Sequence, residues 1–351
     1  MAKNYLQWLT EDTPTKWWHD SAIPAEIEAS IANGALGVTT NPVLTYKSLQ
    51  AAPGYWQPQV DQIPQDLPLE LRAEACLALI ARYAAEKFRP VFEKTGGRHG
   101  YALGQLNPAI CADSEKMLAQ ALRYVSWGEN IAVKLPTVKA ALPVIEDLAS
   151  RGIAVCTTLN FSVAQALAAG AAYERGAQKA REQGIAVKPC FVVQQGGRLD
   201  EYLLDTVLDN GLAVDPEMVR EAGNAVCKKT YRLFQERKIT AKIMPAGLRG
   251  IHYLTAMVGA DMVFSLQSRV QQMLVEADPP RVNHIDEEIP RTSLQKLFRV
   301  PEFVRAYEED GLMPDEFISF ALTQKTLSQF FWTGWAPLET YGSQAKSGRW
   351  F

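Results

Sequence analysis

The sequence lacks the features of a membrane-spanning or nucleic-acid-binding protein. No stretch of its 351 residues approaches the roughly eighteen consecutive apolar residues that a bilayer-spanning helix needs. Lysine and arginine total 36 against 39 aspartates and glutamates, so the net charge is −3 and no basic excess exists to attract nucleic acid or an anionic membrane. The first residues turn polar by Gln7, unlike a secretory signal, and we therefore expect a cytoplasmic protein.

Cysteine and histidine are also scarce. The five cysteines are odd in number and far apart, and none forms a Cys-x-x-Cys pair. This pattern favours reduced thiols and argues against a zinc site. The four histidines are dispersed along the chain, so a metal cluster has little support.

Short apolar runs alternate with longer helical stretches through most of the chain. Hydrophobic residues make up 47% of the sequence and charged residues 21%, as in an ordinary globular protein. Because each run is mostly apolar on both faces, we expect strands of a parallel sheet that is covered on both sides. The eight predicted strands are residues 16–20, 35–40, 101–106, 130–135, 153–159, 185–193, 240–246 and 260–266. The predicted helices include residues 24–33, 69–94, 113–127, 161–183 and 215–237.

Eight strand–helix alternations predict an α/β fold, a closed (β/α)8 TIM barrel with extra C-terminal helices. The competing architecture is an open doubly wound sheet, which usually has fewer strands and a glycine-rich phosphate loop after its first strand. No such loop is present, because Gly96-Gly97 and Gly196-Gly197 are isolated pairs. We therefore predict a single barrel domain over residues 1–351, with a helical extension packed on it over about residues 278–351.

Two segments fall outside the strand–helix repeat. Residues 48–68 contain four prolines and are expected to form a long loop. Residues 278–351 predict two or three more helices and an aromatic tail, which packs in the core, closes over the barrel mouth or forms a subunit contact. The last alternative makes a homodimer a reasonable expectation. The aromatic residues of this tail are Phe330, Phe331, Trp332, Trp335, Trp350 and Phe351.

Lys134 is the unusual residue among those that end the predicted strands, where barrel enzymes collect their reactive groups. It closes an apolar strand, and burial lowers the pKa of a lysine towards neutrality. A neutral amine is the nucleophile that forms a Schiff base with a carbonyl. The alternative is an ion pair between Lys134 and Asp20 inside the barrel. Lys188 and Lys242 are poorer nucleophiles, because we expect them to lie deeper or to face the helices.

Other polar residues also end the predicted strands. Asp20 can move protons between substrate hydroxyls or cap the following helix, whereas His19 is expected to face the other way and to pack as a structural residue. The remaining strand-end residues are Thr39, Thr40, Asn41, Gln105, Asn107, Thr157, Thr158, Asn160, Gln194, Gln195, Arg198 and Arg249.

The run Gly37-Val38-Thr39-Thr40-Asn41-Pro42 resembles the signature of the transaldolase family, which has smaller relatives in the fructose-6-phosphate aldolases. The triplet Asp20-Ser21-Ala22 stands about twenty residues upstream, as in that family, and Val133-Lys134-Leu135-Pro136 resembles the family's lysine-bearing strand. Similar segments run in the same order from about residue 16 to about residue 270.

The resemblance implies Schiff-base chemistry without a cofactor, on a sugar phosphate. Lys134 is the implied nucleophile towards a ketose C2 carbonyl, and Asp20 the implied acceptor of the hydroxyl proton that is lost as the C3–C4 bond breaks. Thr158 is expected to position the water that shuttles protons, with Gln105 beside it.

The substrate-binding residues implied by the resemblance are Asn41, which would hold a substrate hydroxyl, its neighbours Thr39 and Thr40, and the arginines Arg198 and Arg249. The two arginines favour a phosphorylated sugar.

The sequence departs from the family pattern at four places. Gln105 stands where typical transaldolases have a glutamate, although the smaller aldolases carry glutamine, and glutamine cannot accept a proton as a carboxylate does. Cys156 replaces an asparagine, Gly247 replaces a serine, and residues 193–197 replace a Ser-x-aromatic pattern.

Three functions therefore remain open. The first is a transaldolase that moves a dihydroxyacetone unit between sugar phosphates in carbohydrate metabolism, as in the pentose phosphate pathway. The second is an aldolase or transaldolase of the same chemistry with a different, possibly non-phosphorylated, ketose. The third is a non-catalytic barrel that binds sugars or a partner chain.

Overall fold

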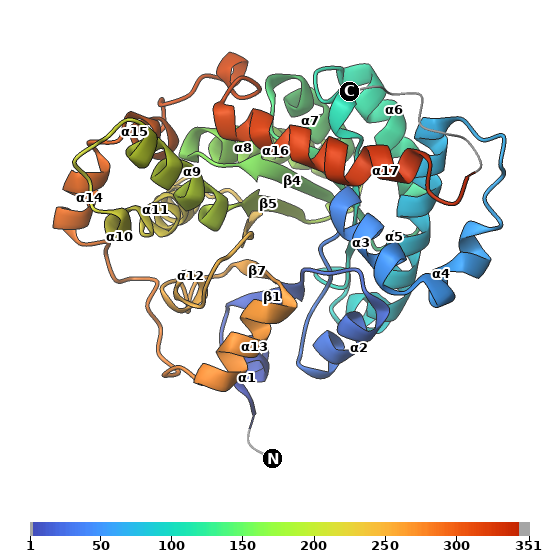
Figure 1. Ribbon diagram of the computed structural model, residues 1–351, viewed down its shortest axis with the longest axis horizontal. Helices are drawn as coiled ribbons and strands as arrows, with labels where there is room; N and C mark the ends of the chain where they lie inside the picture. Colours follow the sequence, from blue (N-terminus) through green and yellow to red (C-terminus); the bar gives the residue numbers. More distant parts are fainter. Residues whose placement is uncertain (1–2, 344–351) are drawn as a thin grey trace.

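The computed structural model describes residues 3–343 and shows a parallel sheet curved around a common interior and wrapped by helices (Figure 1). The strands β2 to β6 pair in chain order, and β1 pairs with β7. Each pairing is parallel, as the strand–helix alternation predicts. The strands are β1 (Lys16–His19), β2 (Ala102–Gln105), β3 (Ile131–Pro136), β4 (Val155–Asn160), β5 (Cys190–Gln194), β6 (Lys242–Pro245) and β7 (Val263–Leu266).

The predicted strand at residues 35–40 is reduced to a single parallel bridge at Val38, which contacts β1 on one side and β2 on the other. The backbone around it still bonds in both directions. Leu36 N donates to Trp17 O at 2.9 Å, and Val38 N donates to Tyr101 O at 3.0 Å. This short extended segment therefore fills the place of the missing strand between β1 and β2. Thr39 N still donates to His19 O at 2.8 Å, and a helix begins three residues later at Pro42.

The predicted α/β barrel fold is confirmed. β6 and β7 pack against each other, so the eight positions surround one interior, although in residues 3–343 no backbone ladder joins this pair. Every strand contributes apolar side chains to the interior, and residues two apart along a strand point the same way. The interior cluster includes Trp18, Leu103, Ala132, Cys156, Phe191, Met244 and Val263.

The helices follow the predicted positions closely where an apolar stripe repeats along them. The long helix predicted at 69–94 has these bounds, and Asp113 caps its helix by accepting a hydrogen bond from Lys116 N at 3.0 Å. The predicted helix at 215–237 is two helices, with a break before Ala222. The barrel helices are α1 (Tyr5–Asp12), α2 (Pro24–Ala32), α5 (Leu69–Lys94), α6 (Ser114–Val125), α7 (Leu142–Ser150), α8 (Val163–Glu182), α9 (Gly196–Asp209), α10 (Pro216–Val219), α11 (Ala222–Glu236), α12 (His252–Thr255) and α13 (Ser268–Ala277). Short 3-10 turns are η1 (Pro108–Ile110) and η2 (Lys139–Ala141).

The prediction of one long loop at residues 48–68 is wrong for its first half. The helix α3 (Pro42–Ala51) runs into this segment and α4 (Pro53–Val60) follows directly. Pro53 begins α4, a position where a helix needs no N–H donor. Trp56 and Val60 are buried, so packing holds the helix in spite of a second proline, Pro58, inside it. The predicted strand at 185–193 is likewise formed only from Cys190 onward.

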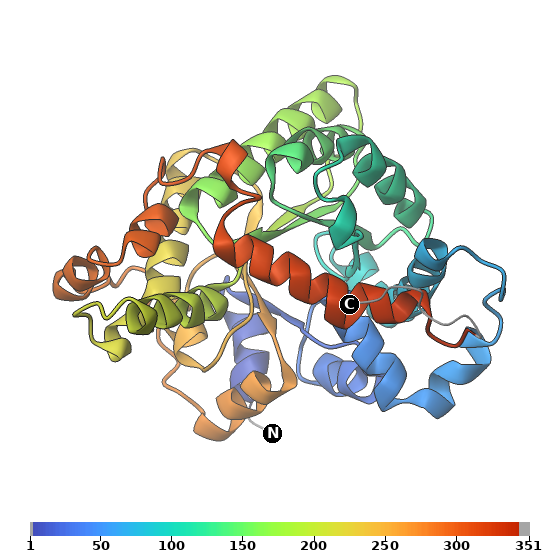
Figure 2. The same cartoon turned by 45° about the horizontal axis from the view of Figure 1, so that its top comes forward.

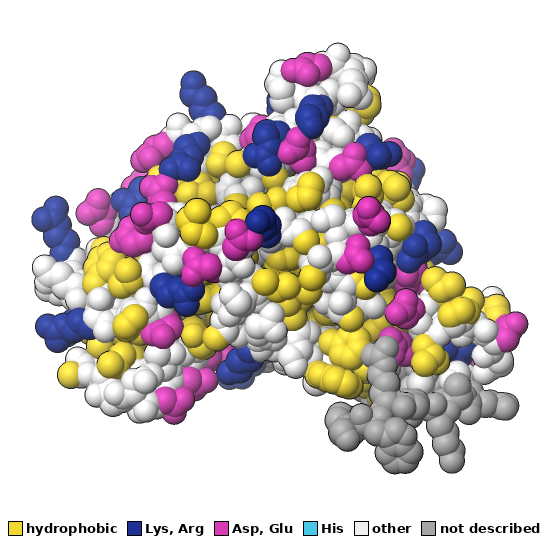
Figure 3. All heavy atoms as spheres, turned by 90° about the horizontal axis from the view of Figure 1, so that it is seen from above, with side chains coloured by type: hydrophobic (Ala, Val, Ile, Leu, Met, Phe, Trp, Pro, Cys, Tyr) yellow, Lys and Arg dark blue, Asp and Glu magenta, His cyan; other side chains and the backbone are white. Residues whose placement is uncertain are grey.

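The C-terminal segment contains more helices than the two or three predicted. α16 runs across the upper face of the barrel in Figures 1 and 2 and continues through a π-helical turn, η4 (Phe331–Trp335), into α17. Figure 3 shows basic and acidic side chains interspersed on this side of the molecule. The remaining elements are α14 (Arg291–Leu297), α15 (Pro301–Tyr307), η3 (Pro314–Glu316), α16 (Ala321–Phe330) and α17 (Ala336–Glu339).

The aromatic tail divides between core and surface. Phe330 and Trp335 are buried, whereas Trp332 is 47% exposed. Trp350 and Phe351 lie outside the described residues. None of the helices in the part of the chain that is described is long and apolar enough to cross a bilayer.

Candidate active site

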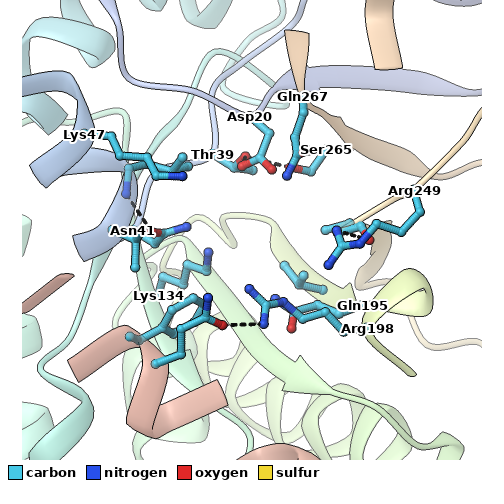
Figure 4. A pocket seen from close by; sticks show the side chains of 17 residues that line it. Asp20, Thr39, Asn41, Lys47, Lys134, Gln195, Arg198, Arg249, Ser265 and Gln267 are labelled. Atoms are coloured by element: carbon cyan, nitrogen blue, oxygen red, sulfur yellow. Dashed lines mark hydrogen bonds between the residues drawn. The ribbon is translucent and has the colours of Figure 1, made fainter. Parts of the chain in front are cut away.

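A polar cavity of about 130 Å³ lies at the carboxyl ends of the strands, where barrel folds place their functional groups (Figure 4). Strand-end residues, α3, the start of α9 and the end of α16 form its walls. The polar side chains that line it are Asp20, Thr39, Asn41, Lys47, Lys134, Gln195, Arg198, Arg249, Ser265, Gln267 and Gln329.

Lys134 projects from β3 into this cavity and is only 4% exposed. Burial lowers the pKa of its amine, and the nearby charges of Asp20 and Arg198 act on the pKa in opposite directions. Its Nζ has one long hydrogen bond, 3.4 Å to the backbone oxygen of Thr40. The alternative ion pair is not formed, because Asp20 faces Lys134 across the cavity without a direct contact. The amine is therefore desolvated, free of a carboxylate partner and open to a ligand.

Two buried polar groups flank Lys134 on the neighbouring strands. Gln105 of β2 lies in register with Lys134, and Thr158 lies in β4 two residues beyond Cys156, the β4 partner of Lys134. Gln105 Oε1 and Thr158 Oγ1 are buried and have no hydrogen-bond partner among the described residues. Burial raises the pKa of the Cys156 thiol to about 12, so this thiol is neutral at physiological pH. Neither Gln105 nor Thr158 lines the open cavity, and both lie on the strands that flank β3.

Asp20 is held in place by a hydroxyl network. Thr39 Oγ1 donates to Asp20 Oδ1 at 2.7 Å and lies 2.6 Å from Ser265 Oγ at the end of β7. His19 points outward, as predicted, and its Nδ1 lies 2.8 Å from Gln271 Nε2 of α13. Burial lowers the pKa of His19 to about 4, so it is a neutral packing residue. The Asp20 carboxylate therefore belongs to the cavity and does not cap α2, which begins without a side-chain cap.

Asn41 and Thr40 play different structural parts. Asn41 caps α3, because its Oδ1 accepts a hydrogen bond from Leu44 N at 2.9 Å, while its amide lines the cavity. The Thr40 hydroxyl instead donates to the backbone oxygen of Leu103, so only the Thr40 backbone faces Lys134. The Thr40 hydroxyl thus bonds within the scaffold, and substrate binding by this residue stays a prediction.

Arg198 and Arg249 meet at one end of the cavity. Arg198 lies in the first turn of α9, and burial, aided by the charge of Arg249, lowers its pKa. Arg249 forms a two-point ion pair with Glu201, with Nη2 at 2.9 Å from Oε2, and this hydrogen bonding raises the Arg249 pKa. Gly197 allows the close approach, since a Cβ there would lie 2.3 Å from the backbone oxygen of Gly247. Gly197 thus serves the packing of α9 against the loop after β6.

Sequence reasoning missed four polar side chains of the cavity. Ser265 and Gln267 end the last strand, and the rule that selected the other strand ends would have found them. Lys47 is an exposed residue of α3, and Gln329 comes from α16, so no local pattern marks either of them. Two other predicted strand-end residues, Gln194 and Asn160, bond within the scaffold. Gln194 donates to Thr230 Oγ1 at 2.9 Å, and Asn160 Nδ2 donates to Val193 O at 2.9 Å.

The competing lysines lie away from the cavity. Lys188 precedes β5 and donates to Glu129 O at 3.3 Å, and Lys242 begins β6 and pairs with Asp261. Within residues 3–343, no group of three or more His, Cys, Asp or Glu side chains is arranged to hold a metal ion.

These features define a (β/α)8-type barrel. One cavity at the carboxyl ends of its strands contains a desolvated lysine and, at one end, two arginines. The model of the family described as transaldolase/fructose-6-phosphate aldolase matches residues 17–318. The chain belongs to this family.

Curated relatives are similar over part of their length. A protein named transaldolase 1 from Streptomyces avermitilis is 27% identical over 233 residues, which cover 64% of this chain and 61% of the relative. A protein named transaldolase from Neisseria meningitidis serogroup A is 32% identical over 191 residues, 53% of this chain and 54% of the relative. The aligned region thus spans between about half and three fifths of these relatives.

Proposed function

We propose that the protein is a transaldolase-type transferase that moves a dihydroxyacetone unit from a ketose phosphate to an aldehyde through a Schiff base on Lys134. The observation that carries the proposal is the buried Lys134 amine, which has no carboxylate partner and faces Asp20 across a polar cavity. Family membership and the relatives named transaldolase support the same reaction class.

The reaction begins when the neutral Lys134 amine attacks the C2 carbonyl of the ketose. The carbinolamine loses water and becomes an iminium ion, which withdraws electrons from the adjacent carbon. The C3–C4 bond then breaks while Asp20 accepts the proton of the C4 hydroxyl, so an aldehyde leaves and an enamine stays on Lys134. The enamine carbon attacks the acceptor aldehyde, Asp20 returns the proton to the new hydroxyl, and water hydrolyses the iminium. No redox partner is needed.

Thr158 and Gln105 serve the water-dependent steps. Their buried, unpartnered oxygens beside Lys134 are suited to hydrogen-bond the water that leaves the carbinolamine and later returns. Thr39 positions the Asp20 carboxylate through its 2.7 Å hydrogen bond. Asn41, whose oxygen is used in capping α3, offers its amide N–H groups to a substrate hydroxyl.

Arg198 and Arg249 bind the phosphate of the sugar. Two guanidinium groups at one end of the cavity form the charge and geometry that a phosphate dianion prefers. Glu201 holds Arg249 by two of its nitrogens and leaves further N–H donors on the same group.

A closely related second function is favoured by Gln105. An amide cannot accept a proton as the carboxylate of a glutamate does, and this difference favours an aldolase that releases free dihydroxyacetone. The two functions share Lys134 and Asp20 and differ in the fate of the enamine.

The proposal is tested with fructose 6-phosphate as donor, with and without an aldose phosphate acceptor. We expect a new ketose phosphate to form only when the acceptor is present, and expect Lys134→Met to abolish it. Equal release of dihydroxyacetone without an acceptor would assign the aldolase function instead. No turnover of either kind by folded protein would contradict both.

A further inference from the structure

The helix α16 contributes two side chains to the cavity. Gln329 and Phe330 end α16, which crosses the barrel in Figure 2, and both line the same cavity as Lys134. The π-helical turn η4 follows directly, and such turns are frequent at functional sites.

This end of α16 is tied to the site on both sides. Gly334 of η4 packs on the start of α3, where an added Cβ would lie 2.5 Å from Val43 N. On the other side Gln329 Oε1 accepts a hydrogen bond from Arg198 Nη1 at 2.7 Å. The Arg198 guanidinium also lies over the Phe330 ring, 5.8 Å from its centroid. The position of Gln329 is therefore set independently of any ligand.

The Nε2 group of the Gln329 amide is available as a hydrogen-bond donor. Its oxygen is committed to Arg198, and no hydrogen bond from Nε2 is formed within the described part of the chain. An amide group is planar, so an oxygen bonded to Arg198 leaves the NH2 directed beside the guanidinium. The loop that carries Arg249 adds no other side-chain donor nearby, because position 247 is glycine.

We propose that Gln329 completes the phosphate-binding subsite, with its oxygen orienting Arg198 and its Nε2 donating to an oxygen of the bound phosphate. This proposal rests on the proposed function for the identity of the sugar phosphate, but the anion subsite itself is a property of Arg198, Arg249 and Gln329. The C-terminal segment thereby selects phosphorylated over unphosphorylated ketoses.

The test compares Gln329→Leu and Gln329→Glu. Leucine has a similar size and removes both hydrogen bonds. Glutamate keeps an acceptor for Arg198 but places a negative charge where the phosphate binds. Gln324→Leu is the matched control, because Gln324 lies on the same helix, is exposed and donates to Ile318 O away from the cavity.

Inorganic phosphate is titrated into each folded variant by calorimetry, and the KM for fructose 6-phosphate is measured in parallel. We expect Gln329→Leu to weaken phosphate binding and raise KM by about 10-fold, as for a lost hydrogen bond to a charged group. Gln329→Glu should weaken phosphate binding further and raise KM further. We expect kcat to change little in both Gln329 variants, and Gln324→Leu to match the wild type. Borohydride trapping of dihydroxyacetone, which has no phosphate, should be unchanged in all variants.

Two results would overturn the role of Gln329. One is unchanged phosphate affinity in Gln329→Leu. The other is wild-type phosphate affinity in Gln329→Glu, a result that would leave Gln329 only as a structural support of Arg198. A wild-type protein that traps neither donor would instead contradict the proposed function, and the phosphate titration would still decide the role of Gln329.

Discussion

Gly197→Ala is expected to separate phosphate recognition from Schiff-base chemistry. The added Cβ would lie 2.3 Å from Gly247 O and 3.0 Å from Arg249 Cγ, whereas ordinary contacts begin near 3.4 Å. The start of α9 and the loop after β6 must therefore move apart by about 1 Å, a displacement that typically lowers catalysis about 100-fold. Because these two elements carry Arg198 and Arg249, we expect this loss in kcat/KM for fructose 6-phosphate. The overpacking should also lower the free energy of unfolding by about 1–3 kcal/mol.

The assay pairs steady-state kinetics with thermal unfolding and trapping of dihydroxyacetone. Lys134 and Asp20 lie on other strands, so trapping of this unphosphorylated donor should fall far less than turnover of the phosphorylated one. Gly54→Ala is the control, because Gly54 lies in α4 with no atom within 4 Å of an added Cβ. This control should leave the kinetics unchanged and stabilise the helix by up to about 1 kcal/mol. Wild-type kcat/KM in Gly197→Ala would refute the view that close packing holds the two arginines.

Three further predictions concern the lysine, its neighbours and the cap of α3. Burial lowers the Lys134 pKa below its ordinary 10.5. Between the folded pKa and 10.5 the unfolded chain binds more protons than the folded protein, so the free energy of unfolding rises with pH. Lys134→Met should therefore raise Tm at neutral pH and flatten the pH dependence of Tm in calorimetric scans. All five cysteines are buried, including Cys156 with its pKa raised to about 12, so a thiol reagent should label none in native protein and five in denaturant. Asn41→Ala should lower the free energy of unfolding by about 1 kcal/mol through the lost cap and also raise KM, and an unchanged KM would remove Asn41 from substrate binding.

The strands and the main site residues were predictable because their signals are local. A buried parallel strand is apolar on both faces, and the residue that ends it points to a known edge of the sheet. This reasoning selects Lys134, Asp20 and Asn41 from their own neighbourhoods, and the arginines follow from the same rule. The exact extent of the strands is less local, and the segment around Val38 forms only a single bridge to each neighbouring strand.

Residues that reach the site from elsewhere carried no such signal. Lys47 is an exposed lysine of α3, which begins at Pro42 and for which no helix was predicted, and Pro53 begins a helix where a loop was expected. Gln329 stands on a C-terminal helix, and only the tertiary packing of α16 across the barrel brings it to Arg198. Thr40 was selected by its strand-end position, but the sequence does not reveal that its hydroxyl donates to the backbone oxygen of Leu103.

The proposed reaction requires a covalent Schiff base between Lys134 and a ketose. The most direct measurement is borohydride reduction of the protein with fructose 6-phosphate, and separately with dihydroxyacetone, followed by digestion and mass spectrometry. We expect an added mass on the peptide that contains Lys134 and no adduct in Lys134→Met. An adduct on another lysine, or none with either donor in folded protein, would contradict it.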